Sequence, residues 1–249
     1  MNILAIIPAR YASTRFPGKP LADIKGKSMI QRVVEQSLKA FEYVYVATDE
    51  HKILEHVNHL GYRAVMTSNQ HKSGTDRCAE ALSIISNELN KKFDIVVNIQ
   101  GDEPFIAPEQ LHLIVKAFEH EPTQIATLIK KIENEQDLFN PNKPKVIVDK
   151  NGKAIYFSRS VIPYIRNHEP NEWLKHHIFY KHIGLYAYRT HTLNEITKLQ
   201  PSSLEKAESL EQLRWIEYGY YIQTLVTTFE TISIDTPEDL ENVLNLFYE

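Results

Sequence analysis

The chain has 249 residues, 43% of them hydrophobic and 24% charged, which excludes a disordered protein. Its net charge of -4 makes a nucleic-acid polymer a poor partner, and its single cysteine, Cys78, excludes a disulfide framework. His176 and His177 lack partners at the spacing of a metal site, so no metal is assigned to them. The sequence holds no run of about 18 apolar residues and starts without the basic region of a signal peptide. We therefore expect a cytoplasmic protein with no membrane partner.

Short apolar, β-branched runs alternate with helical patterns through the first half of the chain. This alternation is typical of repeated βα units, so the expected fold class is α/β, a mostly parallel sheet with helices on both faces. The predicted strands and helices are, in chain order, strand 3–7, helix 29–40, strand 43–48, helix 51–60, strand 64–66, helix 75–89 and strand 95–100. The last of these strands is almost continuously apolar, which indicates a central position.

The pattern changes from about residue 134, where a turn-rich break at 140–144 precedes short strands and polar loops. Because no repeat, linker or low-complexity tract divides the chain, we predict one domain over 1–249 with a lobe inserted at about 150–190. Further on, 205–218 is predicted as one helix. An apolar run at 231–234 then leads through Asp235 into a terminal helix, with Pro237 in its first turn.

A basic loop follows the first predicted strand. Arg10, Arg15 and Lys19 place three positive charges at the carboxyl end of that strand, where ligands bind in a doubly wound sheet. Ser13 adds a hydroxyl, and the small residues let backbone amides approach phosphate oxygens. The loop is not a Walker A motif, since Ser13 stands where that motif needs glycine and Pro20 follows the lysine. A solvated basic loop is the alternative, but the strand context favours a triphosphate site.

Two carboxylates follow apolar runs that are far apart in the sequence. Asp102 comes directly after the strand at 95–100, and Asp235 comes after the run at 231–234. Carboxylates from two strand ends suit Mg²⁺ when substrate phosphates and water supply its other ligands. Asp102 is alternatively a turn residue and Asp235 a helix N-cap. Capping needs only one carboxylate oxygen, so both roles are compatible.

Ser73, Gly74 and Arg77 open a predicted helix. Their hydroxyl, backbone and guanidinium groups suit a base or a ribose, and simple helix capping by Ser73 or Thr75 explains the segment equally well. Both interpretations stay open at this point.

Polar and aromatic side chains also occur in the second half of the chain. Arg159 on one short strand, with His182 and Tyr186 on another, would suit the carboxylate and hydroxyls of an acidic sugar. Packing is the competing interpretation for the histidine and the tyrosine. For Glu211 and Gln212, taken alone, a solvated helix face is favoured.

Taken together and in order, these segments resemble the CMP-Kdo synthetases, the 3-deoxy-manno-octulosonate cytidylyltransferases, nearly from end to end. No single segment is specific, because related sugar nucleotidyltransferases share a basic first loop, but the ordered set is. The resemblance lies in residues 7–15, 17–21, 46–49, 73–77, 100–104, 157–159, 182–186, 210–214 and 235–240.

The resemblance implies a Rossmann-like nucleotidyltransferase domain of the nucleotide-diphospho-sugar transferase type, with the region 157–188 helping to form a homodimer. It implies that CTP and the acidic eight-carbon sugar Kdo react, with Mg²⁺ as cofactor, to give CMP-Kdo and pyrophosphate for lipopolysaccharide biosynthesis. By position, Arg10, Ser13 and Lys19 match the phosphate-binding residues, and Asp102 and Asp235 match the Mg²⁺ ligands. Ser73, Gly74, Arg77 and Gln100 match positions near the nucleoside and the sugar, and the Kdo-binding set is Arg159, His182, Tyr186, Glu211 and Gln212.

Two alternatives to this function remain. One is the same chemistry on 8-amino-Kdo or another acidic sugar such as a sialic acid, and the other is a non-catalytic nucleotide-binding protein on the same fold. The joint presence of Lys19, Asp102, Asp235 and Arg159 argues against the second.

Overall fold

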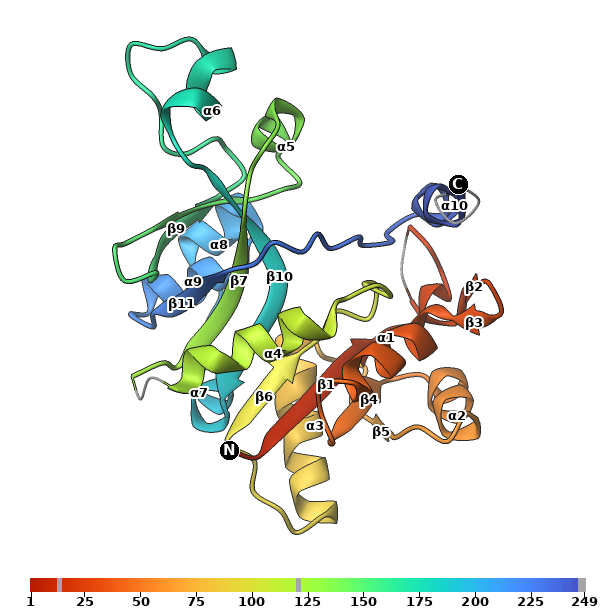
Figure 1. Cartoon of the computed structure of the whole chain (residues 1–249). Helices are drawn as coiled ribbons and strands as arrows, with labels where there is room; N and C mark the ends of the chain where they lie inside the picture. The colour runs from red at the N-terminus through yellow and green to blue at the C-terminus, as the bar shows by residue number, and fades with distance from the viewer. Residues whose placement is uncertain (13–14, 120–121, 246–249) are drawn as a thin grey trace. The chain divides into compact units, whose positions relative to one another are not determined.

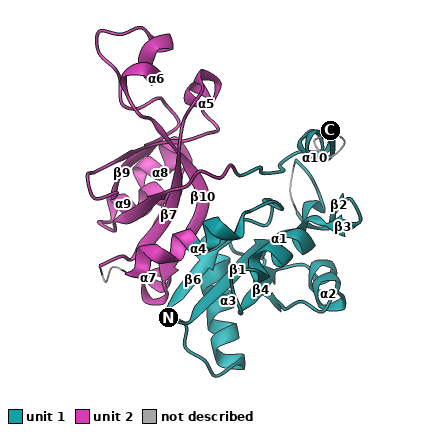
Figure 2. Cartoon of the chain, viewed as in Figure 1, with its two compact units in different colours: residues 1–112, 231–249 teal, residues 113–230 magenta. Residues whose placement is uncertain are grey.

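The computed structural model describes residues 1–12, 15–119 and 122–245. The chain divides into two compact units, one made of Met1–His112 with Thr231–Glu249 and the other of Leu113–Glu230 (Figure 2). The segment 150–190 lies within the second unit, and its role as an inserted lobe stays a prediction. In the described part of the chain, no helix combines the length and the apolar character that crossing a membrane demands.

The first unit contains a parallel sheet in the order β6, β1, β4, β5, with β1 hydrogen-bonded to both β4 and β6 (Figure 1). Its helices α1, α2 and α3 pack against these strands. The strands are β1 (Ile3–Ala9), β4 (Val44–Thr48), β5 (Ala64–Met66) and β6 (Ile95–Asn98), and β2 (Asp23–Ile24) forms a small hairpin with β3 (Lys27–Ser28). The helices are the 3-10 turn η1 (Lys19–Leu21), α1 (Met29–Leu38), α2 (His51–His59), α3 (Gly74–Glu88) and α10 (Pro237–Asn245), and the chain passes into the second unit within α4 (Pro108–Lys116).

Local chemistry accounts for these elements. The side chain of Ser28 caps α1 by accepting a hydrogen bond from the backbone amide of Gln31, and one face of the helix buries Ile30, Val33 and Val34. The four residues from Leu4 to Ile7 in β1 are fully buried, as a strand covered on both faces requires. The strands and helices predicted for this half of the chain are confirmed, with ends that differ by one or two residues.

The second unit is a mixed sheet. Strand β7 pairs in parallel with β11 and in antiparallel with β10, and β10, β8 and β9 continue the antiparallel pairing. The strands are β7 (Ile125–Lys131), β8 (Lys145–Val148), β9 (Ala154–Ser158), β10 (Tyr180–Arg189) and β11 (Ile222–Val226). The helices are η2 (Ala117–Glu119), α5 (Glu135–Phe139), η3 (Pro170–Glu172), α6 (Trp173–His176), α7 (Thr190–Ile196), α8 (Ser203–Glu208) and α9 (Gln212–Glu217). The predicted α/β class, with a mostly parallel sheet and helices, is confirmed.

The single helix predicted over 205–218 is wrong, because the chain forms α8 and α9 with a break between them. Ser209 adopts a left-handed conformation with φ 51°, which ends α8. The guanidinium of Arg159 donates to the carbonyl oxygens of Glu208 (2.6 Å) and Ser209 (3.2 Å), so the carbonyls exposed at the break are satisfied. The apolar residues keep a helical spacing across the break, so the sequence pattern predicted one continuous helix.

Candidate functional site

The loop after β1 ends in a tight turn that positions Lys19. Gly18 has φ 73°, a left-handed conformation that glycine adopts without strain, and its amide donates to the carbonyl of Tyr11 at 3.0 Å. Pro20 is buried and fixes the next backbone angle of η1. The long side chain of Lys19 therefore starts from a rigid backbone.

Asp102 reaches the same place from the loop after β6. A Cβ atom on Gly101 would lie 2.9 Å from the carbonyl oxygen of Pro8, closer than real Cβ atoms approach a backbone atom. Only glycine therefore lets this loop pass so near the end of β1. The close passage carries the carboxylate of Asp102 to 2.7 Å from the ammonium of Lys19.

Asp235 arrives from the C-terminal segment, although not from a strand. Residues 231–236 form no strand, so the prediction of a strand end was wrong. Instead, Ile234 is fully buried and its amide donates to the carbonyl of Asp102 at 2.9 Å, which anchors the segment. The hydroxyl of Thr236 accepts from the amide of Asp239 (3.2 Å), and the carboxylate of Asp239 accepts from the amides of Asp235 and Thr236. Because this reciprocal pair caps α10, the carboxylate of Asp235 is left to interact with Lys19.

Lys19 lies between the two carboxylates. Its Nζ atom is 2.7 Å from Asp102 Oδ2 and 3.1 Å from Asp235 Oδ1, and Arg15 contacts the same Asp235 oxygen at 3.2 Å. Burial by itself lowers the pKa of Lys19, but the charges and hydrogen bonds of the two aspartates outweigh burial, so the pKa is raised. Lys19 is therefore a permanent cation held at a point where two carboxylates converge.

The neighbouring carboxyl of Glu103 behaves differently. Glu103 is 6% exposed, and burial together with the charge of Asp102 raises its pKa to about 8. Its Oε2 atom has no hydrogen-bond partner among the described residues. At neutral pH the protonated form of Glu103 is therefore favoured. The raised pKa of Glu103 could not be predicted from the sequence, because it depends on burial.

A pocket of about 380 Å³ opens beside Lys19 and Asp102. It is lined by the ends of β1 and β6, the basic loop and the start of α3. The lining residues are Pro8, Ala9, Arg10, Ala12, Arg15, Lys19, Pro20, Gly74, Gln100, Gly101 and Asp102. Six of the residues predicted to bind the nucleotide or the metal thus lie around one cavity. Ser13, also predicted, lies outside the described residues.

Two other predicted nucleotide residues have structural partners. Ser73 caps α3, its hydroxyl accepting from the amide of Asp76 at 3.1 Å, as the capping alternative held. Arg77 is fully buried and donates to Asp49 at 2.8 Å and to Thr67 at 2.6 Å. Neither lines the pocket in the described part of the chain, and a contact of either with a nucleotide stays a prediction.

Three of the predicted sugar-binding residues lie together in the second unit, where Tyr186 interacts with both His182 and Glu211. The ring of His182 lies 5.2 Å from the ring of Tyr186, and its Nε2 is 3.1 Å from the hydroxyl of Thr127. Burial lowers the pKa of His182 to about 3, so the ring is neutral. Burial also raises the pKa of Tyr186 well above its ordinary value, helped by the charges of Tyr188 and Glu211. His182 and Tyr186 are therefore uncharged hydrogen-bonding groups, and the charge of the Glu211 carboxylate acts on Tyr186.

Arg159 and Gln212 differ in how free their polar atoms are. The guanidinium of Arg159 donates to three carbonyl oxygens, those of Pro141, Glu208 and Ser209. It therefore holds the turn from which Glu211 and Gln212 follow, and its contact with a sugar stays a prediction. Gln212 is 5% exposed, and its Nε2 donor has no partner among the described residues. A buried donor of this kind is costly unless a ligand satisfies it.

A parallel sheet with cations and carboxylates at the carboxyl ends of its strands defines the class of nucleotide-binding α/β proteins. A family model described as cytidylyltransferase matches residues 4–238. Relatives named 3-deoxy-manno-octulosonate cytidylyltransferase include one from Parabacteroides distasonis, 58% identical over 98% of this chain and 97% of that protein. Another, from Cytophaga hutchinsonii, is 57% identical over 98% of this chain and 96% of that protein.

Among solved structures, a CMP:2-keto-3-deoxy-manno-octonic acid synthetase complexed with CTP is 40% identical and superposes with a TM-score of 0.90, covering 100% of this chain and 99% of that chain. The chain belongs to the cytidylyltransferase family, and within it to the 3-deoxy-manno-octulosonate cytidylyltransferases.

Proposed function

We propose that the chain transfers CMP from CTP to the anomeric hydroxyl of Kdo. The hydroxyl oxygen bonds to the α-phosphorus, the bond between the α-phosphorus and the bridging oxygen breaks, the hydroxyl proton is lost, and pyrophosphate leaves. The product, CMP-Kdo, would serve lipopolysaccharide biosynthesis in the cytoplasm. The names of the relatives and the CTP bound to the solved neighbour support this reaction.

One observation carries the proposal. The ammonium of Lys19 lies within 3.1 Å of the carboxylates of both Asp102 and Asp235, and Lys19 and Asp102 line the pocket that the basic loop borders. A lysine and flanking arginines at the carboxyl end of a strand form a phosphate site, and two converging carboxylates form a site for a cation.

The donor set fits Mg²⁺. Asp102 and Asp235 offer carboxylate oxygens, the hard ligands this ion prefers, and the ammonium of Lys19 already occupies the point on which they converge. When bound there, Mg²⁺ would supply positive charge to neutralise the phosphates. The number of oxygens, two from the protein, leaves the remaining positions to phosphate and water, as is usual for this ion.

Different residues of the chain would then position the phosphates, the nucleoside and the sugar. Arg10 and Lys19 would hold the phosphates and stabilise the charge that grows on the leaving pyrophosphate. Gln100 and Gly74, which line the same pocket, would contact the nucleoside. His182 and Tyr186, both kept uncharged by burial, together with Gln212, would hydrogen-bond the hydroxyls of the sugar. No covalent intermediate is needed, because placing the two substrates in line accounts for the chemistry.

We also propose a homodimer formed through the region 157–188. Tyr164 and Ile178 in this region are 74% and 54% exposed, and Ile155 nearby is 54% exposed. These exposed large apolar side chains support an interface in this region. Analytical ultracentrifugation tests this, since a monomer at all working concentrations would refute it.

The function is tested by pyrophosphate release from CTP with Kdo, 8-amino-Kdo or a sialic acid, with and without Mg²⁺. Asp235→Asn should lower kcat/KM with Kdo by a factor of about 100 or more. The matched control is Glu238→Gln, which removes one charge from an exposed side chain of the same segment and should change nothing. Turnover of a sialic acid in preference to Kdo would refute the substrate. Equal turnover by Asp235→Asn and wild type would refute the site.

A further inference from the structure

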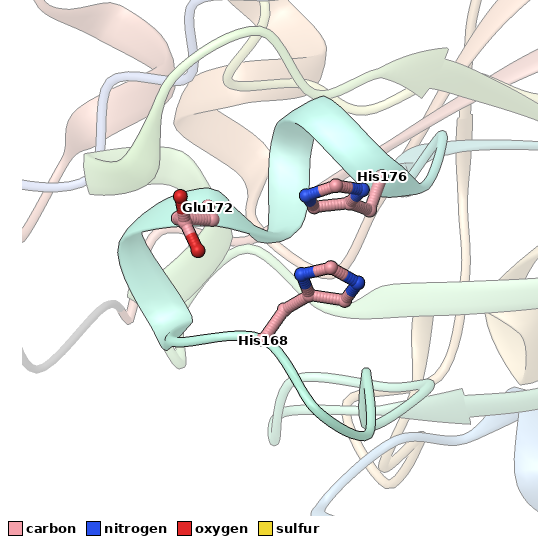
Figure 3. A group of neighbouring side chains, drawn as sticks. All are labelled: His168, Glu172 and His176. Carbon is pink, nitrogen blue, oxygen red and sulfur yellow. The ribbon is translucent and has the colours of Figure 1, made fainter.

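A cluster of metal-ligating side chains lies in the second unit, within the segment around η3 and α6. His168, Glu172 and His176 each offer one ligand atom, and these atoms all lie within 4.8 Å of one another. The two imidazole rings are stacked, with centroids 3.6 Å apart and planes 21° from parallel. Figure 3 shows one nitrogen of each ring on the side where the carboxylate of Glu172 lies.

We propose that these three side chains form a binding site for a zinc-class divalent cation. Two imidazole nitrogens and one carboxylate oxygen are a set of ligands that zinc commonly takes, with a fourth position left for water. Mg²⁺ is a poor occupant, because it prefers oxygen ligands in octahedral geometry. The site is therefore chemically distinct from the carboxylate pair at Asp102 and Asp235.

The distances are compatible with closure around an ion by side-chain rotation. Zinc–ligand bonds of about 2.0–2.2 Å place tetrahedral ligand atoms roughly 3.4 Å apart. Atoms that already lie within 4.8 Å need to approach by little more than about 1 Å. His168 and Glu172 are half-buried and His176 is exposed, so an ion can enter and all three side chains have room to rotate.

The backbone that carries the three ligands is fixed at several points. The indole of Trp173 donates to the carbonyl of His168 at 2.9 Å, and Trp173 itself packs in a buried cluster with Leu138 and Phe179. The amide of Glu172 donates to the carbonyl of Glu169 at 2.9 Å, which closes η3. Because these contacts hold the ligand positions in place beforehand, little conformational entropy opposes binding.

An ion bound here would join the two ends of the segment 168–176. Regular helical spacing suggests ligands on one face of a helix, but here His168 lies in a loop, Glu172 ends a 3-10 turn and His176 ends α6. No metal was assigned to His176 from the sequence, and the proposed site departs from that expectation, which the experiment below tests.

The experiment is calorimetric titration of ZnCl₂ into the full chain after chelator treatment, at pH 7.5. We expect one saturable site per chain in the wild type, and a loss of affinity of about tenfold or more in Glu172→Gln and in His176→Gln. His177→Gln is the matched control, because it changes the adjacent, equally exposed histidine and should bind as the wild type does. Zinc should also raise the Tm of the wild type and of His177→Gln but not of the other two variants.

Equal zinc affinity in His176→Gln and His177→Gln would overturn the proposal, as would the lack of saturable binding by the wild type. Competition by millimolar MgCl₂ would also overturn it. Circular dichroism in the absence of metal establishes that each variant folds. If His176→Gln fails that criterion, Glu172→Gln decides the question, because it keeps the shape of the side chain. The affinity should fall as the pH is lowered, since zinc binds neutral imidazole.

Discussion

Replacing Lys19 by methionine would separate the chemical role of the lysine from its structural one. The ammonium lies within 3.1 Å of both Asp102 and Asp235, so its removal leaves two carboxylates facing each other without their shared cation. Methionine keeps most of the apolar length of the side chain and removes only the charge.

The cost in stability can be worked out from the geometry. Two oxygens within 3.1 Å of one nitrogen are no more than about 6 Å apart, and two unit charges at that distance repel by roughly 0.7–3 kcal/mol for effective dielectric constants between 80 and 20. The side chains of Asp102 and Asp235 are 26% and 37% exposed, which favours the lower part of this range. We expect Lys19→Met to lower the free energy of unfolding by about 1 kcal/mol. The loss of a charge that stabilises the leaving group should cost more, about 3–4 kcal/mol, a factor of about 100 to 1,000 in kcat/KM.

The assay combines pyrophosphate release with urea unfolding followed by circular dichroism. Lys27→Met is the matched control, because Lys27 forms an exposed ion pair with Glu35 at 2.7 Å and its loss should cost less than about 0.5 kcal/mol and leave activity intact. A kcat/KM for Lys19→Met within threefold of wild type would refute the proposed phosphate site. A fall of more than about 3 kcal/mol in stability would show that the lysine is mainly structural.

Three further predictions follow from individual contacts. Gly101→Ala places a Cβ atom 2.9 Å from the carbonyl oxygen of Pro8, so we expect a lower Tm and at least about a tenfold loss of pyrophosphate release, because the loop that carries Asp102 must shift. Burial lowers the pKa of His182 from 6.5 to about 3, so below pH 6.5 the unfolded chain takes up a proton that the folded chain does not. The contribution of the neutral, buried His182 to the free energy of unfolding is therefore complete above pH 6.5 and is lost as the pH falls towards 3. Relative to His182→Gln, the wild type should therefore lose up to about 1.4 kcal/mol of unfolding free energy per pH unit in this window, measured by urea unfolding, and parallel pH profiles would contradict the burial. Arg77→Met should cost about 3 kcal/mol in the same measurement, because it leaves Asp49 without its buried partner, and a change below about 1 kcal/mol would contradict that role.

The sequence predicted the part of the site that depends on strand ends. Lys19 lies in the loop segment that follows β1 and Asp102 in the loop that follows β6, and parallel neighbouring strands bring such loops together whatever the side-chain details. Asp235 was predicted for a reason that proved wrong, since no strand delivers it. Its place depends on one hydrogen bond from Ile234 to Asp102, a long-range contact that leaves no local pattern.

Other features could not be predicted because they depend on which polar group finds a partner. Arg77 is one cation among several in the sequence, and only the fold shows that Asp49 neutralises it and that the hydroxyl of Thr67 accepts a hydrogen bond from it. Arg159 similarly donates to backbone carbonyls at the break between α8 and α9, and the helical periodicity of the sequence could not reveal that break. Burial also decides the charge of Glu103, and burial is a property of the packed chain.

Asp235 lies in a segment that is synthesised late, and this has a consequence for the folding of the nascent chain. A ribosome delivers the sheet strands and the basic loop first, and N-terminal parts of a chain generally fold during synthesis. The nascent protein can therefore form its basic loop before Asp235 is synthesised, and Asp235 reaches Lys19 only when Ile234 docks on the loop of Asp102. Unfinished translation products that end before residue 235 would thus be able to fold their sheet without ever bringing two carboxylates to Lys19.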